Sequence, residues 1–413
     1  MLQSARHGGW ALAICSLVAA GCHKEGPALL PTWSSSQPIY SPHSGSSNGY
    51  NDLVLAAENV QESVKSDYLD RVWFTPGMRE TAVKQAGSAI SRVAAGVSKP
   101  VEFEFVPREP FEASPTNRGW RMIGRTVVWR IETKCAQGDF DGAARDAVLA
   151  TRFGFSLTGG DAMDASLGFA TADEARRALA PHMKEMGAGQ LRELAAGLGR
   201  ALDTRPPLTS TFENEKLDML RAVQMVQDAF VRGEFAGLKE NLGADVRDSV
   251  TYLKDLKEKS PSKQAAYFQG FAAEASERAR WLQALSELPL QERKRDPGPQ
   301  LAESRPWRRF AKHFFTAGEP LMSMRDASLA RTRLMILEAE ILARVKAGLA
   351  APNDLSEFDK ELRTDPYTGR EFVYKAAGNQ FSIYSVGEDL KDDGGQTDES
   401  YSSKDLTLER DAT

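Results

Sequence analysis

The stretch QGDFDGAARDAVLATRFGFSL, residues 137–157, decides the fold class of this chain. It has the pattern of one helix–turn–helix unit. From Gly119 to about Val345 similar patterns follow one another, helix after helix. The breaks between them carry Gly or Pro and lie at 158–161, 204–210, 241–245, 259–263 and 295–300. The sequence therefore predicts a mainly α protein.

The unit at 137–157 resembles those of tetratricopeptide proteins, and a shorter echo, RGEFAGLKENL, begins at Arg232. No period of about 34 residues connects Phe140 with Phe235, so a regular solenoid is not expected. Two later helices carry apolar stripes that we interpret as core, at Leu217, Leu220, Val223, Val226 and Phe230 and at Ala330, Leu334, Leu337, Ile341 and Val345. We expect an irregular array of antiparallel helices.

The N-terminal part of the folded body gives three further predictions. Asn51 is expected to cap an amphipathic helix, and a second helix is expected from about Arg79 to Val97. VEFEFVP, residues 101–107, alternates apolar and polar side chains and predicts a short strand or an extended arm.

Composition sets limits on function. The 413 residues are 41% apolar and 26% charged, which is ordinary for a globular protein, and the net charge of −5 argues against nucleic-acid binding. The densest basic run, QERKRD at 291–296, has flanking acids that nearly cancel it, and we interpret it as a solvated linker.

The first residues have the layout of an export signal. A basic start precedes an apolar run from Trp10 to Ala20, which is too short to span a bilayer core of about 30 Å. VAAGC resembles the bacterial lipobox, although Ala19 stands where leucine is usual, and the resemblance implies lipidation of Cys22; an ordinary cleaved signal is the alternative. His23, in place of aspartate, favours the outer membrane by the enterobacterial sorting pattern. Residues 22–50, rich in Ser, Pro and Gly, then form a flexible tether.

Cysteine and histidine usage gives little sign of catalysis. If Cys15 leaves with the signal and Cys22 is acylated, only Cys135 remains, which excludes an intrachain disulfide framework. We interpret Cys135 as a half-buried structural residue and His182 as a surface or cap residue. Zinc-binding His pairs, nucleophile elbows and phosphate-binding glycine loops are absent from the sequence.

His313 lies in RPWRRFAKHFF, an aromatic and basic segment that predicts a helix. Arg308, Arg309 and Lys312 stand beside its aromatic stripe and could contact anionic lipid headgroups. The simpler interpretation is a core helix whose basic side chains reach outward to solvent.

The C-terminal region, residues 321–395, combines a long helix with a small β element. Asp365-Pro366 starts a turn, and Gly369 supplies a position with positive φ. EFVYK and FSIYSV alternate as two strands joined through AAGNQ, and an acidic loop follows. We expect a hairpin there, and a disordered acidic tail over 396–413.

This order resembles the C-terminal part of the major pseudopilins of type II secretion, whose acidic loop binds calcium. The matching residues are Asp365, Pro366, Tyr384, Ser385, Gly387, Asp389, Asp392 and Asp393. The chain is not itself a pilus subunit, because the helix before the motif is charged and lies deep in the chain. Over most of its length the chain also resembles a group of exported or membrane proteins from planctomycetes, through NGYNDL, GDFDGAARDA, RPPLTSTFENEKL and the closing motif.

The resemblance implies one possible cofactor, calcium. Asp389, Asp392 and Asp393 would supply carboxylate oxygens, and loop carbonyls would complete the shell of six to eight that calcium needs. The alternative is a solvated acidic loop with no metal.

Together these patterns predict a lipid-anchored protein of the bacterial envelope. We expect a signal at 1–21, a tether at 22–50, a helical body at 51–320 and the C-terminal element at 321–395. The expected role is non-enzymatic: a helical scaffold that binds a protein partner in the envelope. The alternatives are an accessory protein of a type II secretion or type IV pilus system and a hydrolase of unknown substrate.

Overall fold

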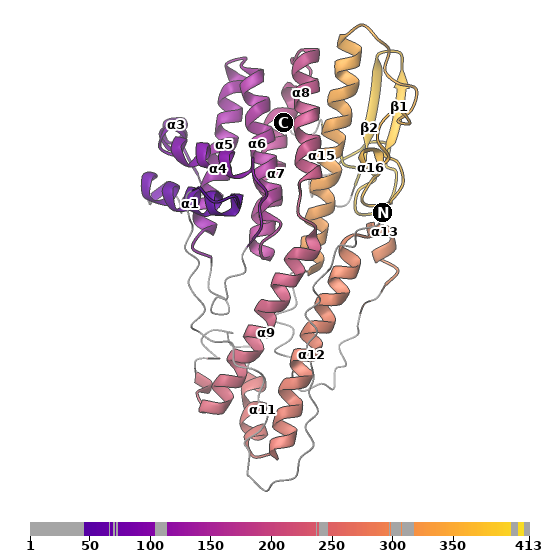
Figure 1. Cartoon of the computed structure of the whole chain (residues 1–413). Helices are drawn as coiled ribbons and strands as arrows, with labels where there is room; N and C mark the ends of the chain where they lie inside the picture. The colour runs from indigo at the N-terminus through magenta and orange to yellow at the C-terminus, as the bar shows by residue number, and fades with distance from the viewer. Residues whose placement is uncertain are drawn as a thin grey trace, which may run out of the picture.

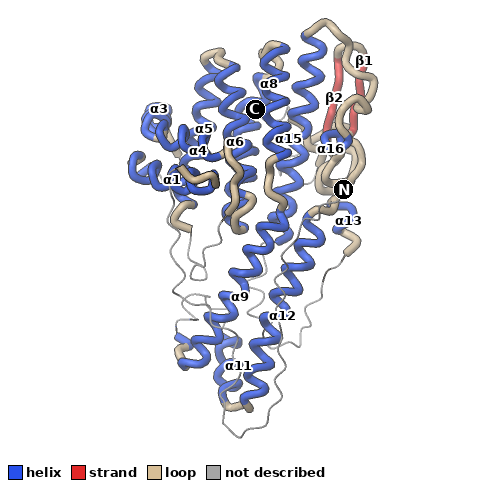
Figure 2. The backbone as a smooth tube through the Cα atoms, viewed as in Figure 1, coloured by secondary structure: helices blue, strands red, loops and turns tan. Residues whose placement is uncertain are grey.

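The computed structural model describes residues 45–408, apart from 66, 69–70, 72, 104–113, 237, 239–246, 297, 299–306, 308–317 and 398–403. Helices build most of this part of the chain, and one small antiparallel hairpin occurs late in the sequence, at residues 373–384 (Figure 2). The prediction of a mainly α fold with a C-terminal hairpin is confirmed. The signal sequence and most of the tether, including Cys22, lie outside the described residues.

Two successive helix hairpins form the centre of the body. The first consists of α5 (Asn117–Ala136) and α6 (Phe140–Leu157), and the second of α7 (Ala162–Leu179) and α8 (Ala188–Asp203). Equivalent helices lie side by side, because α5 packs against α7 and α6 packs against α8. Residues 137–157 contain a turn and the single helix α6, so the helix–turn–helix unit predicted there is wrong in its bounds. The unit is the α5–α6 hairpin, which begins at Asn117 and has a structural neighbour of the same kind that sequence periodicity does not reveal.

Glycines allow these helices to approach closely. A Cβ atom on Gly154 would lie 2.3 Å from the carbonyl oxygen of Gly168, and one on Gly168 would lie 2.1 Å from that of Gly154, so α6 and α7 cross in backbone contact. A Cβ atom on Gly197 would lie 2.6 Å from the Val148 side chain, which brings α8 close to α6. These positions tolerate no side chain without movement of a helix.

The N-terminal helices differ in detail from the prediction. The first, α1 (Gly49–Ser63), is capped by Asn48, whose side chain accepts from the Tyr50 backbone amide; Asn51 lies inside the helix. The helix predicted at 79–97 is two helices, α3 (Pro76–Gln85) and α4 (Gly87–Gly96).

Residues 101–103 form no strand, and the rest of VEFEFVP lies outside the described residues. The Phe103 ring packs 4.4 Å from the ring of Tyr50, measured between centroids. The described part of this segment therefore attaches to the N-terminal end of α1 instead of joining a sheet.

A helical arm projects from the lower end of the body (Figure 1). It contains α9 (Leu208–Arg232), α11 (Arg247–Lys257) and α12 (Pro261–Ser286), and α9 packs along α12. At 1.5 Å per residue, the 25 residues of α9 span about 37 Å. The arm has its own apolar cluster, which includes Val223, Val226, Phe230 and Phe271, so the stripe predicted on α9 is largely core.

The C-terminal part packs against the second hairpin. Helix α15 (Gly318–Lys346) lies against α7 and α8, with Ala330, Leu334, Leu337 and Ile341 buried as predicted. Short helices α13 (Leu290–Arg293) and α16 (Lys360–Arg363) flank the hairpin of β1 (Val373–Ala377) and β2 (Gln380–Tyr384). The strands run further into AAGNQ than predicted, and Gly378, with φ of 64°, begins a two-residue turn.

The C-terminal tail is partly folded, contrary to the prediction of disorder over 396–413. Leu406 and Ser385 exchange backbone hydrogen bonds of 2.8 and 3.0 Å, and Leu406 and Leu408 are buried in the main core. The acidic composition of the tail concealed these two leucines, which attach residues 404–408 beside the end of β2. Within the described ranges, no helix combines the length and the apolar character that a membrane crossing needs.

Candidate binding groove and C-terminal motif

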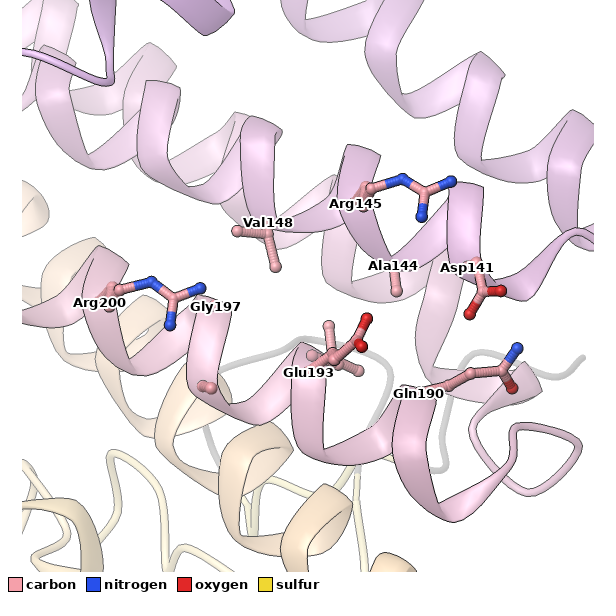
Figure 3. A pocket seen from close by; sticks show the side chains of 10 residues that line it. Asp141, Ala144, Arg145, Val148, Gln190, Glu193, Gly197 and Arg200 are labelled. Atoms are coloured by element: carbon pink, nitrogen blue, oxygen red, sulfur yellow. The ribbon is translucent and has the colours of Figure 1, made fainter.

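A groove of about 350 Å³ runs between the parallel helices α6 and α8. At one end Asp141 of α6 lies opposite Gln190 of α8, and the side chains of Asp141 and Glu193 extend toward the space between the helices (Figure 3). Ala144, Val148, Leu194 and Gly197 supply the apolar part of the lining. The volume lies within the range of ligand-binding clefts.

The groove carries charges of both signs. Asp141, Arg145, Glu193 and Arg200 are all exposed and line it. In the described part of the chain, no ion pair within 4.0 Å engages any of these four side chains. Exposed charges that are not paired within the protein remain available to a bound molecule.

The motif GDFDGAARDA builds the wall of the groove at α6. Gly138, with φ of 74°, makes the turn after α5, and the Asp139 carboxylate caps α6 by accepting from the Gly142 backbone amide at 2.9 Å. Asp146, 4% exposed, accepts hydrogen bonds from Arg130 at 2.9 Å and Lys134 at 2.8 Å on α5. The motif therefore fixes α6 against α5, and its one buried acid, Asp146, has a structural role.

RPPLTSTFENEKL joins the second hairpin to the arm. The Thr211 hydroxyl donates to the carbonyl oxygen of Thr158 at 2.5 Å, and the Asn214 amide donates to those of Gly159 and Gly160 at 3.0 and 2.9 Å. These bonds satisfy carbonyl groups at the end of α6. The segment thus holds the first turns of α9 against the α6–α7 loop.

In the C-terminal motif, the structure brings Asp365 and Ser385 together, a contact that the sequence did not predict. The Asp365 carboxylate accepts hydrogen bonds from the Ser385 hydroxyl at 2.8 Å and from the Tyr367 and Val386 backbone amides at 2.9 and 3.3 Å. Burial raises the pKa of Asp365 to about 6, although these hydrogen bonds act to lower it. Gly369 has φ of 70°, as predicted, and its backbone amide donates to the Asp365 carbonyl oxygen at 2.8 Å.

Two of the three acids predicted to bind calcium, Asp389 and Asp392, accept hydrogen bonds from groups of the loop or of β2. One Asp389 oxygen accepts from the Lys391 backbone amide at 2.9 Å, and one Asp392 oxygen accepts from the Tyr384 hydroxyl at 2.8 Å and the Gly394 backbone amide at 2.9 Å. Asp393 lies beside Asp405, whose carboxylate accepts from the Gly395 amide. Within the described ranges, no three acid, histidine or cysteine side chains form a group suited to a metal ion. Calcium binding therefore stays a prediction, and this arrangement adds no support for it.

Sequence reasoning missed a buried ionic cluster. Asp326 is fully buried on α15 and accepts hydrogen bonds from Arg325 at 2.6 Å and from Arg293. Arg293 belongs to the run 291–296, so the interpretation of this run as a solvated linker is wrong for that residue. The backbone amides of Leu290 and Gln291 also donate to carbonyl oxygens of the C-terminal turn. The charge pattern alone gave no signal, because the partner acid is distant in sequence.

Two of the remaining candidate residues, Cys135 and His182, lie within the described part of the chain. Cys135 is buried on α5, and burial raises its pKa to about 11, so the unreactive thiol form dominates at neutral pH. His182 is half-buried and pairs with Glu185 at 2.9 Å, as expected of a surface residue. His313, Arg308, Arg309 and Lys312 lie outside the described residues.

No family model matches this chain, and neither a curated protein nor a solved structure matches it either.

Proposed function

We propose that this protein is a non-enzymatic binding protein of the bacterial envelope, and that the α6–α8 groove receives an extended peptide segment of a protein partner. The observation that carries the proposal is the groove itself, with charges of both signs that no described residue pairs. A peptide segment can match this pattern with its own acidic and basic side chains. Gln190, at one end, accepts from the Gly187 backbone amide through Oε1 and can donate its amide group to a main-chain carbonyl oxygen of the segment.

The packing of the groove supports a preformed site. Leu194 and Gly197 are buried at its floor, and the contact between Gly197 and Val148 sets the separation of the two helices. A rigid floor reduces the ordering cost of binding, so modest contacts suffice for recognition. The site would therefore select its partner by the order of charges along the segment.

The location of the protein is proposed from its sequence. The export signal and the lipobox-like VAAGC suggest that Cys22 carries lipid and that the body stands on a tether at a membrane, with the outer membrane facing the periplasm as the favoured site. The tether is shorter than the predicted 22–50, because Asn48 caps α1 and α1 begins at Gly49. Replacing Cys22 with serine should release the protein from the membrane fraction. Mass spectrometry that finds residues 1–21 intact on the protein would contradict this location.

A comparison of two neutralising variants tests the groove. Native-membrane extracts are passed over the full chain, the Arg145→Gln/Arg200→Gln variant and the Arg192→Gln control. Arg192 is exposed on the same helix and does not line the groove. We expect the groove variant to retain at most about a tenth of the captured partner, which corresponds to about 1.4 kcal/mol, while the control retains it.

Equal capture by the groove variant and the wild-type chain would contradict the proposal. Loss of capture by both variants would also contradict it, because a general loss of positive charge would then explain the result. Circular dichroism of each variant verifies that the helical body remains folded.

A second candidate is an accessory role in a type II secretion or type IV pilus system. The meeting of Asp365 and Ser385 favours it, since both belong to the motif that resembles pseudopilins. Deletion of the gene should then impair secretion or pilus assembly, and a Ser385→Ala variant should reproduce part of the defect. Normal secretion and piliation in the deletion strain would dismiss this candidate.

A further inference from the structure

The α6–α8 groove has opposite charges at its two ends. Asp141 lines one end and Arg200 lines the other (Figure 3). Both side chains are exposed, and within the described ranges no ion pair of 4.0 Å or less engages either of them. A segment that lies along the groove therefore meets a negative charge at one end and a positive charge at the other.

The contact between Gly197 and Val148 fixes the separation of these two charges along the groove. A Cβ atom on Gly197 would lie 2.6 Å from the Val148 side chain, so these residues stand at the same level of α8 and α6. Asp141 precedes Val148 by seven residues, about 10.5 Å of helix, and Arg200 follows Gly197 by three residues, about 4.5 Å. Because the two helices run parallel, Asp141 and Arg200 are about 15 Å apart along the groove.

The middle of the groove has little net charge. Arg145 on α6 and Glu193 on α8 stand at nearly the same level, about 1.5 Å apart along the helices. A group that lies between them meets opposite charges that nearly cancel. The floor beside them is apolar, because Ala144 and Leu194 are only 6% and 0% exposed. A matching segment therefore needs charges at its ends and an apolar residue at its centre.

We propose that the groove recognises an extended segment in which a basic and an acidic residue are four positions apart, with a small apolar residue midway between them. In an extended chain such residues lie on one side, about 13 Å apart, which matches the separation of Asp141 and Arg200 within the reach of their side chains. The central residue faces the same side and packs on Ala144 and Leu194, while the two intervening residues point to solvent. Both chain directions place the charges correctly. This inference rests on the function proposed for the groove and adds the chemistry of the partner.

Selection from a displayed library of random peptides on the full chain tests this charge order. Peptides enriched on the wild type should carry opposite charges four positions apart at least about threefold more often than the starting library, as expected of exposed ion pairs. The Arg200→Glu variant should instead enrich peptides with two basic residues at this spacing, because both ends of the groove are then negative. Arg192→Glu is the matched control: it is exposed on α8 outside the groove and should select as the wild type does.

Unchanged selection by Arg200→Glu overturns the proposal, and so does the same change of selection by Arg192→Glu. Enriched peptides that fail to bind Arg145→Gln/Arg200→Gln but carry no charge pair at this spacing also overturn it, while they leave the function proposed for the groove intact. Absence of any enriched peptide contradicts both. Circular dichroism shows whether each variant keeps the helical body, so a loss of folding is not mistaken for a change of preference.

Discussion

Asp365 connects the turn at Pro366 with the end of β2 through a single carboxylate. It is 1% exposed, and its hydrogen bonds hold Tyr367, Ser385 and Val386 in fixed positions. Three donors on one acid explain how a hairpin of only five-residue strands keeps a defined place against α15. The aspartate acts here as a structural centre, with no substrate or metal required.

The raised pKa of Asp365 predicts a pH dependence of stability. Its ordinary value is 3.8 and its folded value about 6, so the folded chain binds a proton that the unfolded chain releases between these values. The stabilising contribution is complete below about pH 3.8 and is lost as the pH rises through about 6. Denaturant unfolding at several pH values should show this loss, of about 3 kcal/mol, in the wild type. An Asp365→Asn variant with the same pH slope as the wild type would contradict the assignment.

Asp326 should be among the most sensitive positions for stability. Asp326→Ala leaves Arg293 and Arg325 buried without their shared carboxylate, and we expect the free energy of unfolding to fall by about 3–5 kcal/mol. Glu185→Ala is the control, since it removes only the solvent-accessible pair of Glu185 with His182. Its loss of unfolding free energy should be less than about 1 kcal/mol. Equal losses in the two variants would show that Asp326 is not a buried ionic centre.

The calcium prediction can be settled on the full chain. If the acidic loop binds calcium, calorimetry should detect uptake by the wild type and a strong reduction in Asp392→Ala/Asp393→Ala. The matched control is Asp354→Ala, an exposed acid outside the loop. No uptake by the wild type, or the same uptake by the loop variant, dismisses calcium and leaves the solvated loop.

Among the elements, the crossing of α6 and α7 depends most on single residues. Gly154→Ala places a methyl group 2.3 Å from the Gly168 carbonyl oxygen, so the helices must separate, and we expect a loss of about 1–3 kcal/mol in unfolding free energy. Gly199→Ala on α8 is the matched control, because a Cβ atom there meets nothing within 4 Å. That change should stabilise the chain by about 0.5–1 kcal/mol. A stabilising Gly154→Ala would contradict the close crossing.

The elements also show what local sequence can predict. Helix α6 ends at Leu157, as expected, and the hairpin lies where alternating residues indicate, because caps, turns and apolar periods are local signals. The helix cap at Asn48 lies within a few residues of the predicted cap at Asn51, whereas the break at Ala86 divides what the pattern predicts as one helix. Boundaries depend on competing local bonds, and the pattern alone does not choose between Asn48 and Asn51.

The groove and the charged clusters could not be predicted in this way. The groove exists only because α6 and α8 pack side by side, and these helices belong to different hairpins. The local sequence predicts that Arg293 is solvated, because its partner Asp326 is distant in the sequence and lies beside it only in the folded chain. Likewise, the burial of Leu406 depends on a contact with Ser385. Each of these features depends on contacts between residues that are distant in the sequence, and such contacts leave no periodic pattern in the sequence.

At the scale of the whole molecule, the chain combines a helical body, a projecting arm and a C-terminal element (Figure 1). The body contains the main core, while the arm is stabilised largely by its own cluster around Val223 and Phe271. The sequence-based tether would let this body move relative to a membrane while the groove keeps its shape.

Site-specific photo-crosslinking in cells tests the central claim, that the α6–α8 groove holds a protein partner. A photoreactive residue at Ala196, exposed on the groove, is compared with one at Ala95, exposed on α4. We predict a discrete crosslinked species from position 196 that disappears in the Arg145→Gln/Arg200→Gln background and is absent from position 95. No adduct at 196, or the same adduct from both positions, would contradict the account.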